Sequence, residues 1–113
     1  MIKDVFSISP SIRYVAAYRD GQLTSQSKAN TIAASSSESD RYEELLVNPT
    51  LLKLASQRGN IDCGGLRYLL VRYGNFFQLV LPHEWGHISV CIEATADVIE
   101  IGEQIEALMR TLK

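Results

Sequence analysis

Residues 76–93, FFQLVLPHEWGHISVCIE, decide which fold the chain can adopt. They contain His83-Glu84-Trp85-Gly86-His87, the His-Glu-x-x-His spacing of zinc proteases, in which two histidines one helical turn apart hold the metal and the glutamate is the general base. This chemistry needs a helix. Pro82 cannot lie inside a helix that continues from upstream, and the short apolar and aromatic run Phe76 to Leu81 is typical of a buried strand. The upstream sequence therefore favours a strand over a zinc-binding helix.

The run after the motif, Ile88 to Glu93, alternates apolar and polar residues with a period of two, which also indicates a strand. We predict strands at 76–81 and 87–93, joined by a hairpin loop at 82–86 in which Gly86 is free to take a positive φ. Both histidines would then be exposed loop residues, and no metal is expected. The alternative is a small zinc-dependent hydrolase that uses His83, Glu84 and His87, with Glu106, nineteen residues beyond His87, as a third ligand.

The length of 113 residues fits one domain spanning 1–113, and 46% hydrophobic residues can build a core. A net charge of −2 gives no reason to expect nucleic acid or an anionic membrane as a partner. No apolar run reaches the roughly 18 residues that span a bilayer, and residues 1–6 do not resemble a secretory leader. Cys63 and Cys91 lack a CxxC spacing, so we expect a reduced, cytoplasmic protein; a redox role for the two thiols stays open.

The remaining elements follow from periodicity and turn signals. Asp20-Gly21 predicts a hairpin between strands at 12–19 and 22–28, and Gly74-Asn75 predicts another after a strand at 66–73. We expect a short helix at 2–8 and a serine-rich loop at 29–41. A helix at 40–58 should be interrupted and restarted at Asn48-Pro49, with Asn48 as N-cap, and end at Gly59. A last helix at 95–112, capped by Thr95, carries one apolar stripe made of Val98, Ile101, Ile105, Leu108 and Leu112.

The predicted order is α-β-β-α-β-β-β-α, an α+β fold. The strands at 12–19, 66–73 and 76–81 have apolar residues on both faces. A sheet with one solvated face would show a cleaner alternation, so both faces of this sheet must be covered.

Three stretches carry a resemblance to a known family. Residues 14–23, YVAAYRDGQL, form a strand ending in a charged residue plus Asp-Gly; residues 66–75, LRYLLVRYGN, form a strand and turn; and residues 86–92, GHISVCI, precede the terminal helix. In these places, and in the order of elements over nearly the whole chain, the sequence resembles the roadblock / dynein light chain family. The first helix is shorter than in that family, and Pro49 interrupts the middle helix.

The resemblance implies a profilin-like fold, with a five-stranded antiparallel sheet and helices on both faces. Members of the family are mostly dimeric adaptors without a catalytic centre or cofactor, and bacterial and archaeal members resemble regulators of small Ras-like GTPases. It therefore implies a non-enzymatic, dimeric regulatory or scaffolding protein that binds a protein partner, a small GTPase among the candidates.

In the strand order implied by the resemblance, the strand at 66–73 lies at an edge of the sheet. An apolar edge without proline needs a partner, so we expect two copies to pair there as a homodimer, flanked by the helix at 40–58. Trp85, in the predicted turn, is the expected partner-binding residue. The expected dimer interface consists of Leu66, Tyr68, Leu69, Leu70, Val71 and Tyr73.

Overall fold

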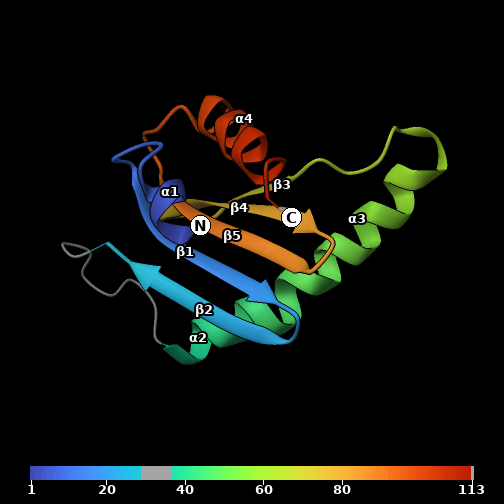
Figure 1. Cartoon of the computed structure of the whole chain (residues 1–113), viewed down its shortest axis with the longest axis horizontal. Helices are drawn as coiled ribbons and strands as arrows, with labels where there is room; N and C mark the ends of the chain where they lie inside the picture. Colours follow the sequence, from blue (N-terminus) through green and yellow to red (C-terminus); the bar gives the residue numbers. More distant parts are fainter. Residues whose placement is uncertain (29–36, 113) are drawn as a thin grey trace.

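The computed structural model describes residues 1–28 and 37–112 (Figure 1). The predicted serine-rich loop therefore falls largely outside the described residues. The described elements are α1 (Ile2–Phe6), β1 (Ile12–Arg19), β2 (Gln22–Ser27), α2 (Ser37–Tyr42), the π-helical turn η1 (Glu43–Val47), α3 (Asn48–Asp62), β3 (Leu69–Arg72), β4 (Phe76–His83), β5 (Gly86–Glu93) and α4 (Val98–Met109).

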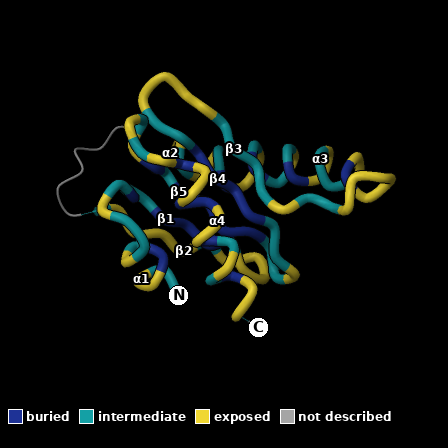
Figure 2. The backbone as a smooth tube through the Cα atoms, turned by 90° about the horizontal axis from the view of Figure 1, so that it is seen from above, coloured by how far each residue is buried: buried dark blue, intermediate teal, exposed yellow. Residues whose placement is uncertain are grey.

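The five strands form one antiparallel sheet in the order β2-β1-β5-β4-β3. The predicted α+β class, the order of elements and the edge position of the strand within 66–73 are thereby confirmed. β1, β5 and β4 are the inner strands, and the buried residues gather along them (Figure 2). Among the described helices, none is long and apolar enough to cross a membrane.

Helices cover both faces of the sheet, as the two-sided apolar strands predicted (Figures 1 and 2). On one face, Val5 of α1 and the stripe of α4 pack against alternate residues of the inner strands. Ile105, at the centre of that stripe, is completely buried, while Leu108 and Leu112 are partly buried against the same core. The helix begins at Val98 with Asp97 as N-cap, because the Asp97 carboxylate accepts the Glu100 N–H at 3.3 Å; the predicted cap at Thr95 is wrong.

Strict alternation along β1 would place Ile12 on the same face as Tyr14, but a bulge changes this. Ile12 pairs with Ile92 and Tyr14 with Cys91, so two steps along β1 match one step along β5. Since a one-residue slip moves every side chain to the other face, Ile12 joins Val15 in the core instead of lying with Tyr14.

β4 runs through Pro82 to His83, two residues further than predicted, and the turn is reduced to Glu84-Trp85. The Tyr73 N–H donates to the Phe76 carbonyl, so by alternation the backbone of Pro82 faces the β3 side of β4. β3 stops opposite Val80. Pro82 therefore lies where no strand needs its missing N–H, which is how a proline is tolerated here.

The middle helix passes Asn48-Pro49 without the predicted break. Asn48 has helical dihedral angles, and its N–H donates to the carbonyl of Glu43, five residues back. This π-helical turn accommodates the proline, which an uninterrupted α-helix would not. Asn48 is therefore not an N-cap. Gly59 does not end the helix either: it is buried within α3, where an added Cβ would lie 3.1 Å from the Gly65 backbone.

Candidate functional site

The two histidines of the His-Glu-x-x-His motif lie on opposite faces of the sheet. His83 pairs with Gly86 and His87 with Pro82 across the β4–β5 hairpin, and neighbouring pairs of a strand point to opposite sides. His83 lies on the α4 side. His87 lies on the α3 side and is buried, and His83 is half-buried at the end of β4, so the prediction that both are exposed loop residues is wrong.

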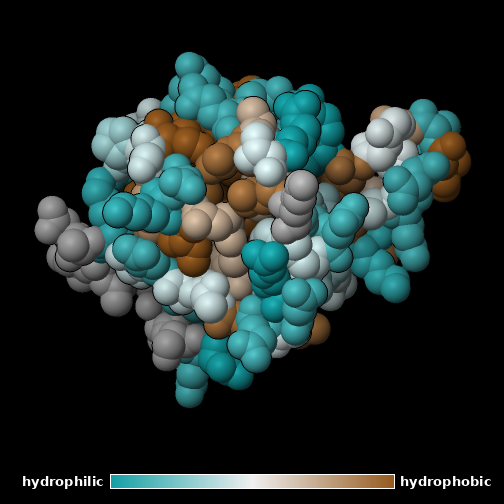
Figure 3. Space-filling model, in the orientation of Figure 1, coloured by the Kyte–Doolittle hydropathy of each residue, from teal (hydrophilic) through white to brown (hydrophobic). Residues whose placement is uncertain are grey.

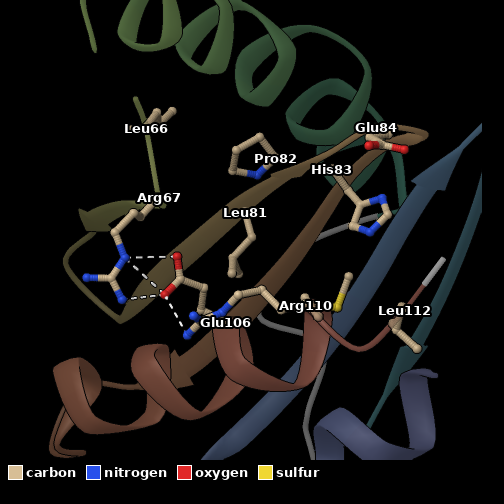
Figure 4. A pocket seen from close by; sticks show the side chains of 10 residues that line it. Leu66, Arg67, Leu81, Pro82, His83, Glu84, Glu106, Arg110 and Leu112 are labelled. Atoms are coloured by element: carbon tan, nitrogen blue, oxygen red, sulfur yellow. Dashed lines mark hydrogen bonds and ion pairs between the residues drawn. The ribbon is translucent and has the colours of Figure 1, made fainter. Parts of the chain in front are cut away.

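The three other residues of the alternative zinc site share a cavity of about 740 Å³ between the end of β4, the segment before β3 and the last turns of α4 (Figure 4). His83, Glu84 and Glu106 line it, but Glu106 is engaged by two arginines. The Arg67 Nε donates to both carboxylate oxygens at 3.0 Å, and Arg110 Nη2 lies 3.6 Å from Oε1. Within residues 1–28 and 37–112, no group of three or more His, Cys, Asp or Glu is placed to hold a metal.

Polar side chains fill the layer between the sheet and the middle helix. Oε1 of Glu44, in η1, lies 2.9 Å from Nε2 of His87 and accepts the Asn48 Nδ2–H at 3.0 Å. All three side chains are almost completely buried. This cluster fastens the π-helical turn to β5, and sequence reasoning missed it. The available signal was the alternation of β5, which places His87, Ser89 and Cys91 on the face opposite Ile88 and Val90.

Gln78 of β4 extends the polar layer. Its Nε2 donates to Ser89, and its Oε1 accepts the Cys91 S–H at 3.0 Å. Burial raises the pKa of the Cys91 thiol to about 12. Cys63 is exposed after the end of α3, and both thiols are free.

The two cysteines should therefore differ strongly in reactivity. At pH 8 a disulfide reagent such as DTNB is expected to modify about one thiol per native chain quickly and two in denaturant, because Cys91 holds almost no thiolate at that pH. Cys63→Ser should abolish the fast reaction. Two fast thiols in the native protein would contradict the burial of Cys91, and none would contradict the exposure of Cys63.

Trp85 lies in the β4–β5 turn and packs on its own chain. Its ring centroid is 4.4 Å from that of His83, and the guanidinium carbon of Arg19 is 5.1 Å from it. Its carbonyl accepts the Asp20 N–H at 2.9 Å, so the two hairpin tips are joined. The indole is half-buried. These contacts give Trp85 a structural role, and its predicted role in partner binding stays a prediction.

β3 leaves one edge of the sheet open. The strand covers only Leu69–Arg72, and among the described residues no other strand lies beyond it. Since Tyr73 bonds to β4 through its N–H, alternation places the backbone groups of Val71 and Leu69 toward β4 and those of Leu70 and Arg72 toward the open side. Two residues thus offer unpaired donors and acceptors to another strand.

The residues before and after β3 are fixed to helices on opposite faces. Tyr68 donates its hydroxyl to Glu103 at 2.7 Å on α4, and the hydroxyl of Tyr73 donates to the Glu43 carboxylate at 3.1 Å on η1. Burial raises the pKa of Tyr73, and the neighbouring carboxylate raises it further. Leu66 lines the large cavity. Leu66 and Tyr68 are therefore outside the edge strand that was predicted to contain them.

The middle helix exposes more large apolar side chains than any other described element. Its C-terminal end projects beyond the sheet and carries apolar surface near its tip, at the right of Figure 3. Ile61 is 75% exposed and Leu54 is 62% exposed. The complete set on α2, η1 and α3 is Tyr42, Leu45, Leu46, Leu54 and Ile61.

Comparison with known proteins does not identify a family for this chain. A scan against protein-family models gives no match, and a search of curated protein sequences gives none.

Proposed function

We propose that the protein is a non-enzymatic, dimeric regulatory or scaffolding protein in which two copies pair through β3 and bind a protein partner. The open edge of β3 is the main observation that supports this proposal. Leu69, Leu70 and Val71 are only partly buried there, and the strand has neither a proline nor a covering segment among the described residues. Such an edge promotes association with another strand.

Pairing of two β3 strands about a two-fold axis would join the sheets and satisfy the outward backbone groups of Leu70 and Arg72. Helices would continue to cover both faces of the joined sheet. Because Tyr73 is bonded to Glu43, the exposed Leu45 and Leu46 of η1 lie on the element beside this seam and would add apolar contact. The resemblance to the roadblock / dynein light chain family supports the same arrangement, with a small Ras-like GTPase as the partner.

The dimer is tested by light scattering after size exclusion, with an expected mass of twice the 12.6 kDa of one chain. Arg72→Pro should reduce it to a single chain, because proline removes an outward donor from an exposed position. Arg72→Ala is the matched control and should stay dimeric, since it keeps the N–H.

Leu69→Pro would instead break a bond to β4 and unfold the edge. A mass of one chain for the unmodified protein at micromolar concentration, or an unchanged mass in a folded Arg72→Pro variant, would contradict pairing through β3.

A further inference from the structure

The outer face of α3, formed by Thr50, Leu54, Gln57 and Ile61, points directly away from the sheet. The buried residues of the helix are Asn48, Leu52 and Gly59. At about 100° per residue, Leu54 and Ile61 lie on the opposite side of the helix from these three. Within the described part of the chain, the outer face therefore does not take part in the packing of its own domain.

This face carries a depression of about 280 Å³ that is predominantly apolar. Four of the residues that line it, Thr50, Lys53, Leu54 and Gln57, have the spacing i, i+3, i+4, i+7. Four residues at this spacing form the hole that receives one side chain of a neighbouring helix in knobs-into-holes packing. Ile61 continues the same row seven residues after Leu54. The shape fits a helix laid along α3.

The charges on the outer face indicate which kind of helix would bind along α3. Arg58 is paired with Asp62, with Nη1 2.6 Å from Oδ1. Lys53, at the rim of the depression, is exposed and has no ion pair within the described part of the chain. Among the described residues, the face is thus apolar at its centre and has one unpaired cation, Lys53, at its border, although the whole chain has a net charge of −2.

We propose that the outer face of α3 is a docking site for an amphipathic helix of a protein partner, with apolar residues at heptad spacing and acidic residues beside them. The proposal rests on the proposed function, since it names the class of partner that the dimer binds. Pairing through β3 leaves this face free, because the face points away from the sheet and not along it. The proposed function already places the second copy at β3, so this face is left for a different protein.

The test uses a fluorescent synthetic peptide of three heptads with leucine and isoleucine at the apolar positions and glutamate at both flanking positions. An otherwise identical peptide with lysine in place of glutamate is the charge control. The like flanking charges keep each peptide from pairing with itself. Fluorescence anisotropy with the full chain should show saturable binding of the acidic peptide only.

Leu54→Asp should weaken that binding at least about tenfold, because it places a carboxylate in the hole and removes its apolar wall. The matched control is Ile99→Asp, a similar change at a side chain that is 55% exposed on α4, and it should have no effect. Lys53→Glu should transfer the preference from the acidic peptide to the basic one.

In the binding assay, three results would overturn the proposal: no saturable binding of the acidic peptide, equal binding of both peptides, or binding that Leu54→Asp leaves unchanged. Light scattering separates its failure from that of the proposed function. A dimer that does not bind the acidic peptide refutes only the docking site, whereas a single-chain mass for the unmodified protein refutes the pairing through β3. A dimer that Leu54→Asp converts to single chains would assign the face to a second copy and so refute the docking site.

Discussion

Gly86→Ala is expected to lower the free energy of unfolding by about 4 kcal/mol or more, or to prevent folding. Gly86 has a φ of 146°, and an added Cβ would overlap the carbonyl oxygen of Tyr18 and lie 3.0 Å from its carbon. Both atoms belong to the backbone of β1, so neither can move without separating the central strands. Urea denaturation followed by tryptophan fluorescence at Trp85 measures the effect.

Two other glycines separate the cost of the positive φ from the cost of the overlap with Tyr18. Gly21 also has a positive φ, of 84°, but an added Cβ would meet no atom within 4 Å; Gly21→Ala should cost about 1 kcal/mol. Gly74 has open space and no positive φ, so Gly74→Ala should change stability by less than about 0.5 kcal/mol. Equal effects at Gly86 and Gly21 would show that the close approach to Tyr18 is not what requires the glycine.

Glu44→Ala is expected to cost about 2–6 kcal/mol, because it leaves two buried hydrogen-bonding groups without a partner and each such group costs about 1–3 kcal/mol. The Glu44 carboxylate oxygen bonds to both His87 and Asn48, and Asn48 Oδ1 is already buried without a partner in the described structure. Truncation would leave two more polar groups unsatisfied in a region that water does not reach. The free energy of unfolding from urea denaturation checks the value.

Glu44→Gln is the matched control, because its amide oxygen can accept the same two hydrogen bonds. It should retain most of the stability that Glu44→Ala loses. Glu43→Ala, next along the chain, removes a carboxylate that is bonded only at the rim, to Tyr73, and should cost about 1 kcal/mol. A loss of less than about 1 kcal/mol for Glu44→Ala would mean that water reaches the cluster.

The sheet could be predicted because its signals are local and agree with one another. Asp20-Gly21 and Gly74-Asn75 mark two hairpins, and β1, β4 and β5 lie where alternation and apolar runs place them. The zinc-like spacing at 83–87 was correctly assigned to a hairpin, because Pro82 and the strand-like flanks outweigh a five-residue motif. The position of His87 could not be predicted, since its partner Glu44 is forty-three residues away and joins it only in the folded chain.

The errors lie where tertiary contacts overrule local preferences. Asn48-Pro49 is a strong signal for a new helix, yet burial of Asn48 against Glu44 holds the chain in one continuous helix. The first residues of the predicted edge strand leave the sheet because Arg67 and Tyr68 bond to Glu103 and Glu106 on α4. The bulge that moves Ile12 into the core leaves no mark in the local sequence.

Because of the π-helical turn at Glu43–Val47, the number of residues in this segment determines which side of α3 faces the sheet. A turn closed five residues back holds about one residue more than an α-helical turn, which shifts the side chains beyond it by about 100° around the axis. Glu44 lies within the turn and Asn48 directly follows it, and both side chains are buried against the sheet. If the turn were one residue shorter, either Glu44 or Asn48 would point away from the sheet. The outer face of α3 would rotate by the same angle. The segment acts as a spacer in which the number of residues sets the rotation of α3 about its own axis.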